Sequence, residues 1–118
     1  MDRHHKINYL EIPASDIQKN KQFFSDTFGW RFQDYGPDYC AIENAGIDGG
    51  FFRSDQAAST ESGSVLIVLY SNDLKETQLA IQKNGGQIIK DIFSFPGGKR
   101  FHFEDPCGNE YAVWVESK

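Results

Sequence analysis

Two side chains in this sequence have proton-transfer chemistry and lie within otherwise apolar patterns. Glu11 sits in an alternating stretch, where a carboxylate could act as a general base, hold a cationic ligand or bond to a hydroxyl or N–H group of the fold. His102 is the one histidine beyond the first ten residues. It could transfer a proton near neutral pH, or it could be a structural histidine of a strand, held by hydrogen bonds in the wall of a cavity. We favour the structural role for both and keep both as catalytic candidates.

His102 belongs to a stretch, residues 101–115, that predicts a strand, a tight turn and a second strand. Apolar residues alternate on either side of the turn sequence DPCGN at 105–109, in which Pro, Gly and Asn suit the bend. Glu104 and Asp105 beside this turn are expected to be solvated or capping residues. The face opposite the apolar one carries His102, Glu104, Glu110, Ala112 and Trp114.

The first half of the chain predicts one helix among four strands. Asp16 is a suitable N-cap for a helix that reaches about Phe28, and Gly29 ends it. The apolar residues Ile17 and Phe24 fall at helical spacing and form its buried stripe. Strands are expected at 7–13, 30–33, 39–43 and 47–53.

The same order then recurs after a small, polar linker at 54–63. Asp73 follows Asp16, and Gly86 follows Gly29, at the same distance of 57 residues. This shared register predicts an internal duplication, with two βαβββ modules at 7–53 and 64–117 in one domain over 1–118. Further strands are expected at 65–70, 87–92 and 99–104, and the glycines of 96–98 could form a flap.

The composition of the chain argues against several classes of binding partner. A formal net charge of −5 argues against nucleic acid and anionic membranes, which favour clustered Lys and Arg. No apolar run approaches the roughly 20 residues that span a bilayer, and no signal-peptide core follows the start. Cys40 and Cys107 have no metal or redox spacing, which favours free thiols in a reducing cytoplasm.

Three motifs together give the chain a resemblance to a known family. They are YLEIPASD at 9–16, FGW at 28–30 and DPCGN at 105–109. The chain resembles the vicinal oxygen chelate superfamily, which includes glyoxalase I, bleomycin-resistance proteins and extradiol dioxygenases. The resemblance implies an α+β fold with curled mixed sheets around a cavity. It also implies a homodimer, in which the facing modules come from different chains.

The resemblance also identifies the positions of the family's metal ligands. Carried over by motif, they are Tyr9, Gly50, Leu66 and Ala112, where the family's enzymes have His, Gln or Glu. Gly, Leu and Ala offer no donor atom, and a free phenol ionises only near pH 10. A catalytic site needs about three protein ligands, so we expect no metal and no other cofactor here. A displaced site built from Glu11, Glu110 and His102 is the alternative.

The predicted cavity face is mostly apolar and aromatic, which is typical of a small-molecule pocket. Phe52 and Trp114 could stack on a planar or cationic ligand, and Lys99 with Arg100 could meet an anionic one or be solvated. The first hypothesis is a metal-free protein that binds a small organic molecule. The alternatives are a glyoxalase-like lyase or isomerase, or a dioxygenase-related enzyme, using Glu11 or His102, and a structural partner without ligand. Candidate ligand-binding residues are Tyr9, Glu11, Gly50, Phe52, Leu66, Val68, His102, Ala112 and Trp114.

Overall fold

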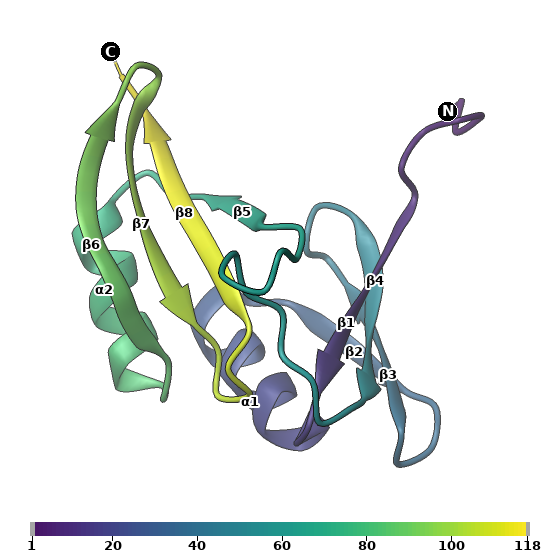
Figure 1. Ribbon diagram of the computed structural model, residues 1–118. Coiled ribbons are helices and arrows are strands. Elements are labelled where there is room, and N and C mark those ends of the chain that lie inside the picture. The colour runs from purple at the N-terminus through teal and green to yellow at the C-terminus, as the bar shows by residue number, and fades with distance from the viewer. Residues whose placement is uncertain (1, 118) are drawn as a thin grey trace.

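The computed structural model describes residues 2–117, which fold into two four-stranded sheets and two helices (Figure 1). Each half of the chain has the order strand, helix and three strands, so the α+β fold of tandem βαβββ modules is confirmed. No helix within 2–117 is long and apolar enough to cross a membrane. The elements are β1 (Tyr9–Ala14), α1 (Ile17–Phe28), β2 (Arg31–Asp34), β3 (Tyr39–Glu43), β4 (Asp48–Arg53), β5 (Ile67–Tyr70), α2 (Leu74–Lys83), β6 (Gln87–Phe95), β7 (Gly98–Glu104) and β8 (Glu110–Glu116).

The two sheets share one topology. The first has the order β1-β4-β3-β2 and the second β5-β8-β7-β6, with the first strand parallel to the last in each module. Glu11 pairs with Gly50 in the first sheet, and Val68 pairs with Ala112 in the second. Glu11 and Val68 are 57 residues apart, the same offset as the two helix caps. The duplication therefore extends from the helices to the register of the strands.

Both helices begin where the sequence predicts. The Asp16 carboxylate accepts a hydrogen bond from Lys19 N at 3.1 Å, and Asp73 accepts one from Glu76 N at the same distance. Each cap satisfies a backbone donor that the first helical turn would otherwise leave free. Gly29 ends α1 in the left-handed conformation, with φ of 73°, which glycine adopts at little cost.

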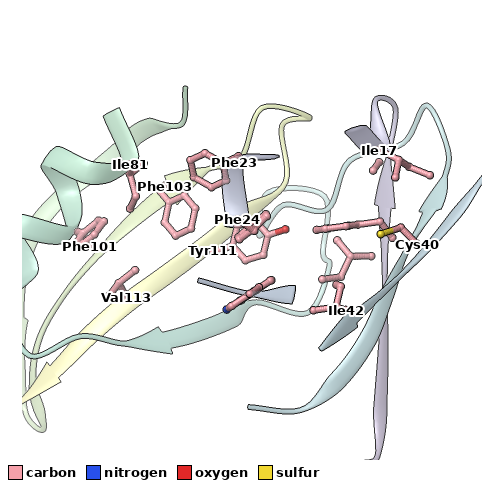
Figure 2. Packing of buried hydrophobic residues seen from close by; sticks show 14 of the residues in the cluster. Ile17, Phe23, Phe24, Cys40, Ile42, Ile81, Phe101, Phe103, Tyr111 and Val113 are labelled. Carbon is pink, nitrogen blue, oxygen red and sulfur yellow. The ribbon is translucent and has the colours of Figure 1, made fainter. Parts of the chain in front are cut away.

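The hydrophobic core lies around α1, between the two sheets. Phe23 and Phe24 of α1 occupy the middle of the core, with Phe103 and Tyr111 of the second sheet on one side and Ile42 of the first on the other (Figure 2). Trp30 follows the helix and stacks on Phe24, with ring centroids 4.4 Å apart. One apolar core therefore joins the two modules, and each sheet turns one face toward the helices.

The hairpin of β6 and β7 is longer than its pattern predicts. β6 continues to Phe95 and pairs there with Gly98, so residues 96 and 97 form a tight turn rather than a flap. Register shifts between Ile88 and Lys90 and between Lys90 and Phe93 interrupt the alternation on which the prediction depended. The first strand of the second module is shorter than predicted, beginning at Ile67 rather than at 65.

Asp105 is buried, which corrects the expectation of a solvated residue, and it caps backbone donors of its own turn, which was the other expectation. Its Oδ1 accepts hydrogen bonds from the backbone N–H groups of Cys107 and Asn109, at 2.9 and 3.0 Å. Its Oδ2 accepts from the Asn20 amide at 2.9 Å, the Asn109 amide at 3.0 Å and the Tyr111 hydroxyl at 2.7 Å. Five donors thus converge on one carboxylate, because burial leaves no water to satisfy it.

The same cluster fastens the linker and the first module. The Asn109 side chain donates to the Pro13 carbonyl of β1 at 2.7 Å and accepts from Ala58 N at 2.8 Å. Asn20, which donates to Asp105, lies on α1. The DPCGN turn is therefore the point at which β1, α1 and the linker are held to the second sheet.

Asp105→Ala should destabilise the protein by about 3 kcal/mol, because it leaves several buried donors without an acceptor. Urea denaturation of the variant and the wild type measures the loss. Asp55→Ala, at an exposed aspartate, is the matched control and should change little. A loss from Asp105→Ala of less than about 1 kcal/mol would show that the cluster does not hold the modules together.

Candidate functional site on the outer faces of the two sheets

Each sheet has an outer face, turned away from the helices and the core. On β1 the core residues Ile12 and Ala14 alternate with Glu11 and Pro13, and on β8 the core residues Tyr111 and Val113 alternate with outward ones. The outer face of the first sheet carries Tyr9, Glu11, Tyr39, Ala41, Gly50 and Phe52. The outer face of the second sheet carries Val68, Tyr70, Lys90, Phe93, Arg100, His102, Ala112 and Trp114.

A chain of three polar side chains occupies the outer face of the first sheet. The Tyr39 hydroxyl donates to Glu11 Oε2 at 2.9 Å, so the Tyr9 hydroxyl, 2.5 Å from that of Tyr39, is the donor in the second bond. Burial, together with the bonds to Tyr9 and Glu11, raises the pKa of Tyr39 above its usual range. Tyr39 therefore remains a neutral phenol that donates to Glu11.

Tyr39 is a site residue that the sequence analysis missed, and it changes the meaning of Gly50. Its ring lies over Gly50, where a side-chain Cβ would clash with the Tyr39 hydroxyl. The space that the glycine leaves is thus filled by the tyrosine rather than left open to a ligand. Phe52, predicted as a stacking residue, is partly buried and is the strand neighbour of Tyr39. The signal available in the sequence was an aromatic residue on the strand beside a strand glycine.

The outer face of the second sheet consists of two rows that cross all four strands. One row, aromatic apart from one arginine, is Tyr70, Trp114, Arg100 and Phe93. The other is Val68, Ala112, His102 and Lys90. Tyr70 meets Trp114 edge to face at 5.1 Å between centroids, and Phe95 lies 6.2 Å from the same indole. The predicted residues Val68, His102, Ala112 and Trp114 are therefore brought together.

His102 is held by a buried carboxylate. His102 Nδ1 lies 2.7 Å from Glu110 Oε2, and both side chains are less than a tenth exposed. Glu110 Oε1 accepts from the N–H and the hydroxyl of Thr60, at 2.8 and 2.9 Å. The carboxylate partner assigns the Nδ1 proton to His102 as a donor. The other ring nitrogen, Nε2, is buried without a partner among the described residues.

The pKa of Glu110 shows which state the fold prefers. Burial alone would raise it, but the hydrogen bonds from His102 and Thr60 outweigh burial and lower it below 4.5. The ionised carboxylate is thus the form that the folded protein stabilises. Since Thr60 belongs to the linker, this bond also seats the linker against the second sheet.

The two outer faces do not meet within one chain. Among residues 2–117, no hydrogen bond joins them, and Figure 1 shows the two sheets as separate walls. A cavity of about 670 Å³ lies instead between β1 and β5, and its lining combines core residues with the outer-face residues Val68 and Tyr70. Leu66 and Val68 line it, whereas Tyr9, Glu11, Gly50 and Phe52 do not. Its other lining includes Ile7, Leu10, Ile12, Phe28, Trp30, Ile42, Val65, Ile67, Leu69 and Tyr70.

The four positions at which the family's enzymes hold a metal do not suit one here. Tyr9 is hydrogen-bonded to Tyr39, Gly50 is covered by that same ring, and Ala112 has no donor atom. Leu66 precedes β5 and faces the cavity. Among residues 2–117, no group of three or more His, Cys, Asp or Glu side chains is arranged to hold an ion.

The two cysteines lie away from these positions, and neither forms a disulfide. Burial raises the pKa of the Cys40 thiol to about 11.

Two tandem βαβββ modules, with outer faces in the register of Glu11–Gly50 and Val68–Ala112, define a protein of the glyoxalase-like class. A family model of the Glyoxalase/Bleomycin resistance protein/Dioxygenase superfamily matches residues 6–113, and the chain belongs to this superfamily.

Known relatives agree with this assignment. A glyoxylase-like domain-containing protein of Didymella fabae is 34% identical over an alignment of 122 positions, gaps included, that covers 93% of each chain. A glyoxalase-related enzyme from Fulvimarina pelagi has a similar fold, with a TM-score of 0.78, 14% identity and coverage of 95% of this chain and 88% of that one. TnmS3, an antibiotic binding protein from Streptomyces sp. CB03234, has a TM-score of 0.71 at 18% identity, with coverage of 99% and 100%.

Glu110→Gln should cost about 1–2 kcal/mol of stability at pH 7, because it weakens the charged hydrogen bond to His102. Because the pKa of Glu110 is lower in the folded protein than its ordinary value of 4.5, the ionised carboxylate stabilises the fold above pH 4.5. This stabilisation is lost as the pH falls through the pKa of the folded state. Urea denaturation should therefore show the difference between wild type and variant shrinking as the pH falls below 4.5.

Glu43→Gln, at an exposed glutamate of β3, is the matched control. A difference that grew on acidification would contradict the assignment of an ionised Glu110 in the folded protein.

Proposed function

We propose that this protein binds a small organic molecule in an aromatic-lined cavity, without a metal at the family's ligand positions. The observation that carries the proposal is the outer face of the second sheet. Tyr70, Phe93, Phe95 and Trp114 remain partly or largely exposed there. Aromatic side chains left accessible on one face provide stacking area for a planar ligand.

The relatives support binding as a role for this fold. TnmS3 is described as an antibiotic binding protein, whereas the protein from Fulvimarina pelagi is described as a glyoxalase-related enzyme. Both resemble this chain in fold, and one fold hosts many functions. The absence of donor atoms at Gly50, Leu66 and Ala112 favours the binding role over metal-dependent chemistry.

We also propose that the working form is a homodimer. The outer face of one copy's first sheet would lie opposite the outer face of the other copy's second sheet and close two cavities. In support, large apolar side chains are exposed along the edge strands β1 and β5 and just before them. They are Ile7, Tyr9, Val65, Val68 and Tyr70, with Ile7 and Val65 80% and 82% exposed. Apolar patches of this kind are typical of protein interfaces.

A second candidate is a lyase or isomerase that moves a proton with Glu11. The observation that favours it is the chain from Tyr9 through Tyr39 to the exposed Glu11 carboxylate. A relay of this form can supply or remove a proton at the surface of a cavity. His102 is less suited to that role, because its free nitrogen Nε2 is covered.

A thermal-shift screen of small aromatic compounds tests the binding proposal. At least one compound should raise the melting temperature. At concentrations above its dissociation constant, the increase should grow with the logarithm of the compound's concentration. Trp114→Ala should remove the shift, whereas Leu79→Ala, on the exposed side of α2, should retain it.

Elemental analysis of the purified protein separates the two candidates. We expect no stoichiometric zinc, nickel, manganese or iron. Such a metal, removed by Glu11→Ala or His102→Ala, would establish the displaced metal site of an enzyme and contradict the proposal.

The dimer should appear in light scattering as a mass near twice 13.4 kDa. Val65→Asp should shift the equilibrium toward the monomer, because it places a charge in the apolar contact. Leu79→Asp introduces the same charge at another exposed apolar position and is the matched control. A wild-type protein that remains monomeric at high concentration would refute the paired arrangement.

A further inference from the structure

We infer that the ligand is a planar aromatic anion and that Arg100 holds its acidic group on the outer face of the second sheet. The inference rests on the proposed binding function and adds the chemical class of the ligand. It follows from what Arg100 contacts, from the polar atoms that lack partners and from the aromatic side chains around them.

Arg100 has a charge and a donor that the described part of the chain does not satisfy. No carboxylate lies within salt-bridge distance of its guanidinium in residues 2–117, and its Nε is buried without an acceptor. An arginine donor left unpaired in a buried position is costly, and it favours any ligand that brings a charged acceptor. A carboxylate is the acceptor that matches the planar guanidinium fork.

Aromatic rings fix the arginine in place. Its guanidinium carbon lies 5.4 Å from the centroid of Phe93 and 5.7 Å from that of Phe95. Cation–π contacts of this kind hold the guanidinium without neutralising its charge. The side chain is therefore organised before a ligand arrives, and little conformational entropy remains to be lost on binding.

The neighbours of Arg100 supply a surface for a flat ring. Arg100 is the cross-strand partner of Trp114, which is in turn the partner of Tyr70 on β5. The ring of Phe95 also lies near this indole, with 6.2 Å between the ring centroids. A ring stacked on Trp114 would have an acidic substituent directed toward the guanidinium on the next strand, about 5 Å away.

The second row adds a cation and a buried nitrogen without a partner. Lys90 Nζ lies 4.5 Å above the ring of Phe93 and has no salt-bridge partner among residues 2–117. His102, two residues from Arg100 on the same face, has the unpartnered Nε2. Lys90 therefore places a second positive charge in the row beside Arg100.

No acidic residue of this sheet forms a salt bridge with Arg100 or Lys90 among residues 2–117. Glu110 is bound by His102 and Thr60, and Glu116 interacts with the Tyr70 hydroxyl at 3.5 Å. Glu104 lies opposite Glu110 at the other end of β7. None forms a salt bridge with Arg100 or Lys90, so a cationic ligand would meet two unpaired positive charges on this face.

Three naphthalene compounds of the same shape test the charge. They are naphthalene-2-carboxylate, naphthalene-2-carboxamide and 2-naphthylmethylammonium, which carry a negative, a neutral and a positive substituent. Isothermal titration of the full-length protein should show the carboxylate binding about tenfold or more tightly than the amide, as expected for a charge-assisted hydrogen bond. The ammonium compound should bind most weakly, and added salt should weaken the carboxylate alone.

Arg100→Met should bring the carboxylate to the affinity of the amide while leaving the amide unchanged. Arg100→Lys should keep part of the preference. Lys99→Met is the matched control, because it removes the same charge from the same strand on the opposite face, where Lys99 is exposed. Thermal unfolding gives a second readout: an arginine held for a ligand can be replaced by Met without loss of stability, whereas a structural one cannot.

A wild-type protein that binds the amide or the ammonium compound as tightly as the carboxylate would overturn the inference and leave the binding function standing. So would a preference for the carboxylate that persists in Arg100→Met. Failure of all three compounds would overturn the inference too, and the wider thermal-shift screen would then decide the proposed function separately.

Discussion

The Asp105 carboxylate is the interaction on which the arrangement of this protein depends. It is buried at the turn between β7 and β8, and it accepts hydrogen bonds from both modules. Burial of an ion is costly, and burial raises the pKa of Asp105 even though hydrogen bonds from Tyr111, Asn109 and Cys107 oppose the effect. The cost is offset only when every donor is in position, so the carboxylate selects the one packing in which Asn20 and Asn109 reach it together.

That packing determines where a ligand can bind. Because α1 packs between the sheets, the core takes up one face of each, and no hydrogen bond joins the two outer faces among residues 2–117. The two faces also differ in chemistry although their strands share a register. Glu11 and Gly50 of the first sheet lie under Tyr39 in a polar chain, whereas Val68 and Ala112 at the equivalent places lie beside Trp114 and unpaired cations. The two sheets thus share a strand order and register, but their outer faces carry different side chains and would recognise different ligands.

Much of the fold could be predicted from the sequence, because its signals are local. The caps Asp16 and Asp73, the stop at Gly29 and the repeated spacing all follow from short-range chemistry. The extension of β6 to Phe95 could not be predicted, since the register shifts conceal its alternation. The role of Asp105 was missed because its partner Asn20 is 85 residues away, and that of Tyr39 because it depends on a cross-strand diagonal. The local pattern did group Val68, His102, Ala112 and Trp114 on one face. It could not show that Tyr9, Glu11, Gly50 and Phe52 lie on a different sheet, whose outer face does not meet that one within the chain.

The placement of the two indoles has a spectroscopic consequence. Trp30 is buried and stacks on Phe24 in the core that joins the modules, while Trp114 is partly exposed among Tyr70 and Phe95. A shielded indole emits at shorter wavelength than a hydrated one, so the emission of the folded protein is the sum of two distinguishable chromophores. Removing either one by a Trp→Phe change would leave a single intrinsic reporter, of global unfolding at Trp30 or of solvent access to the outer face at Trp114.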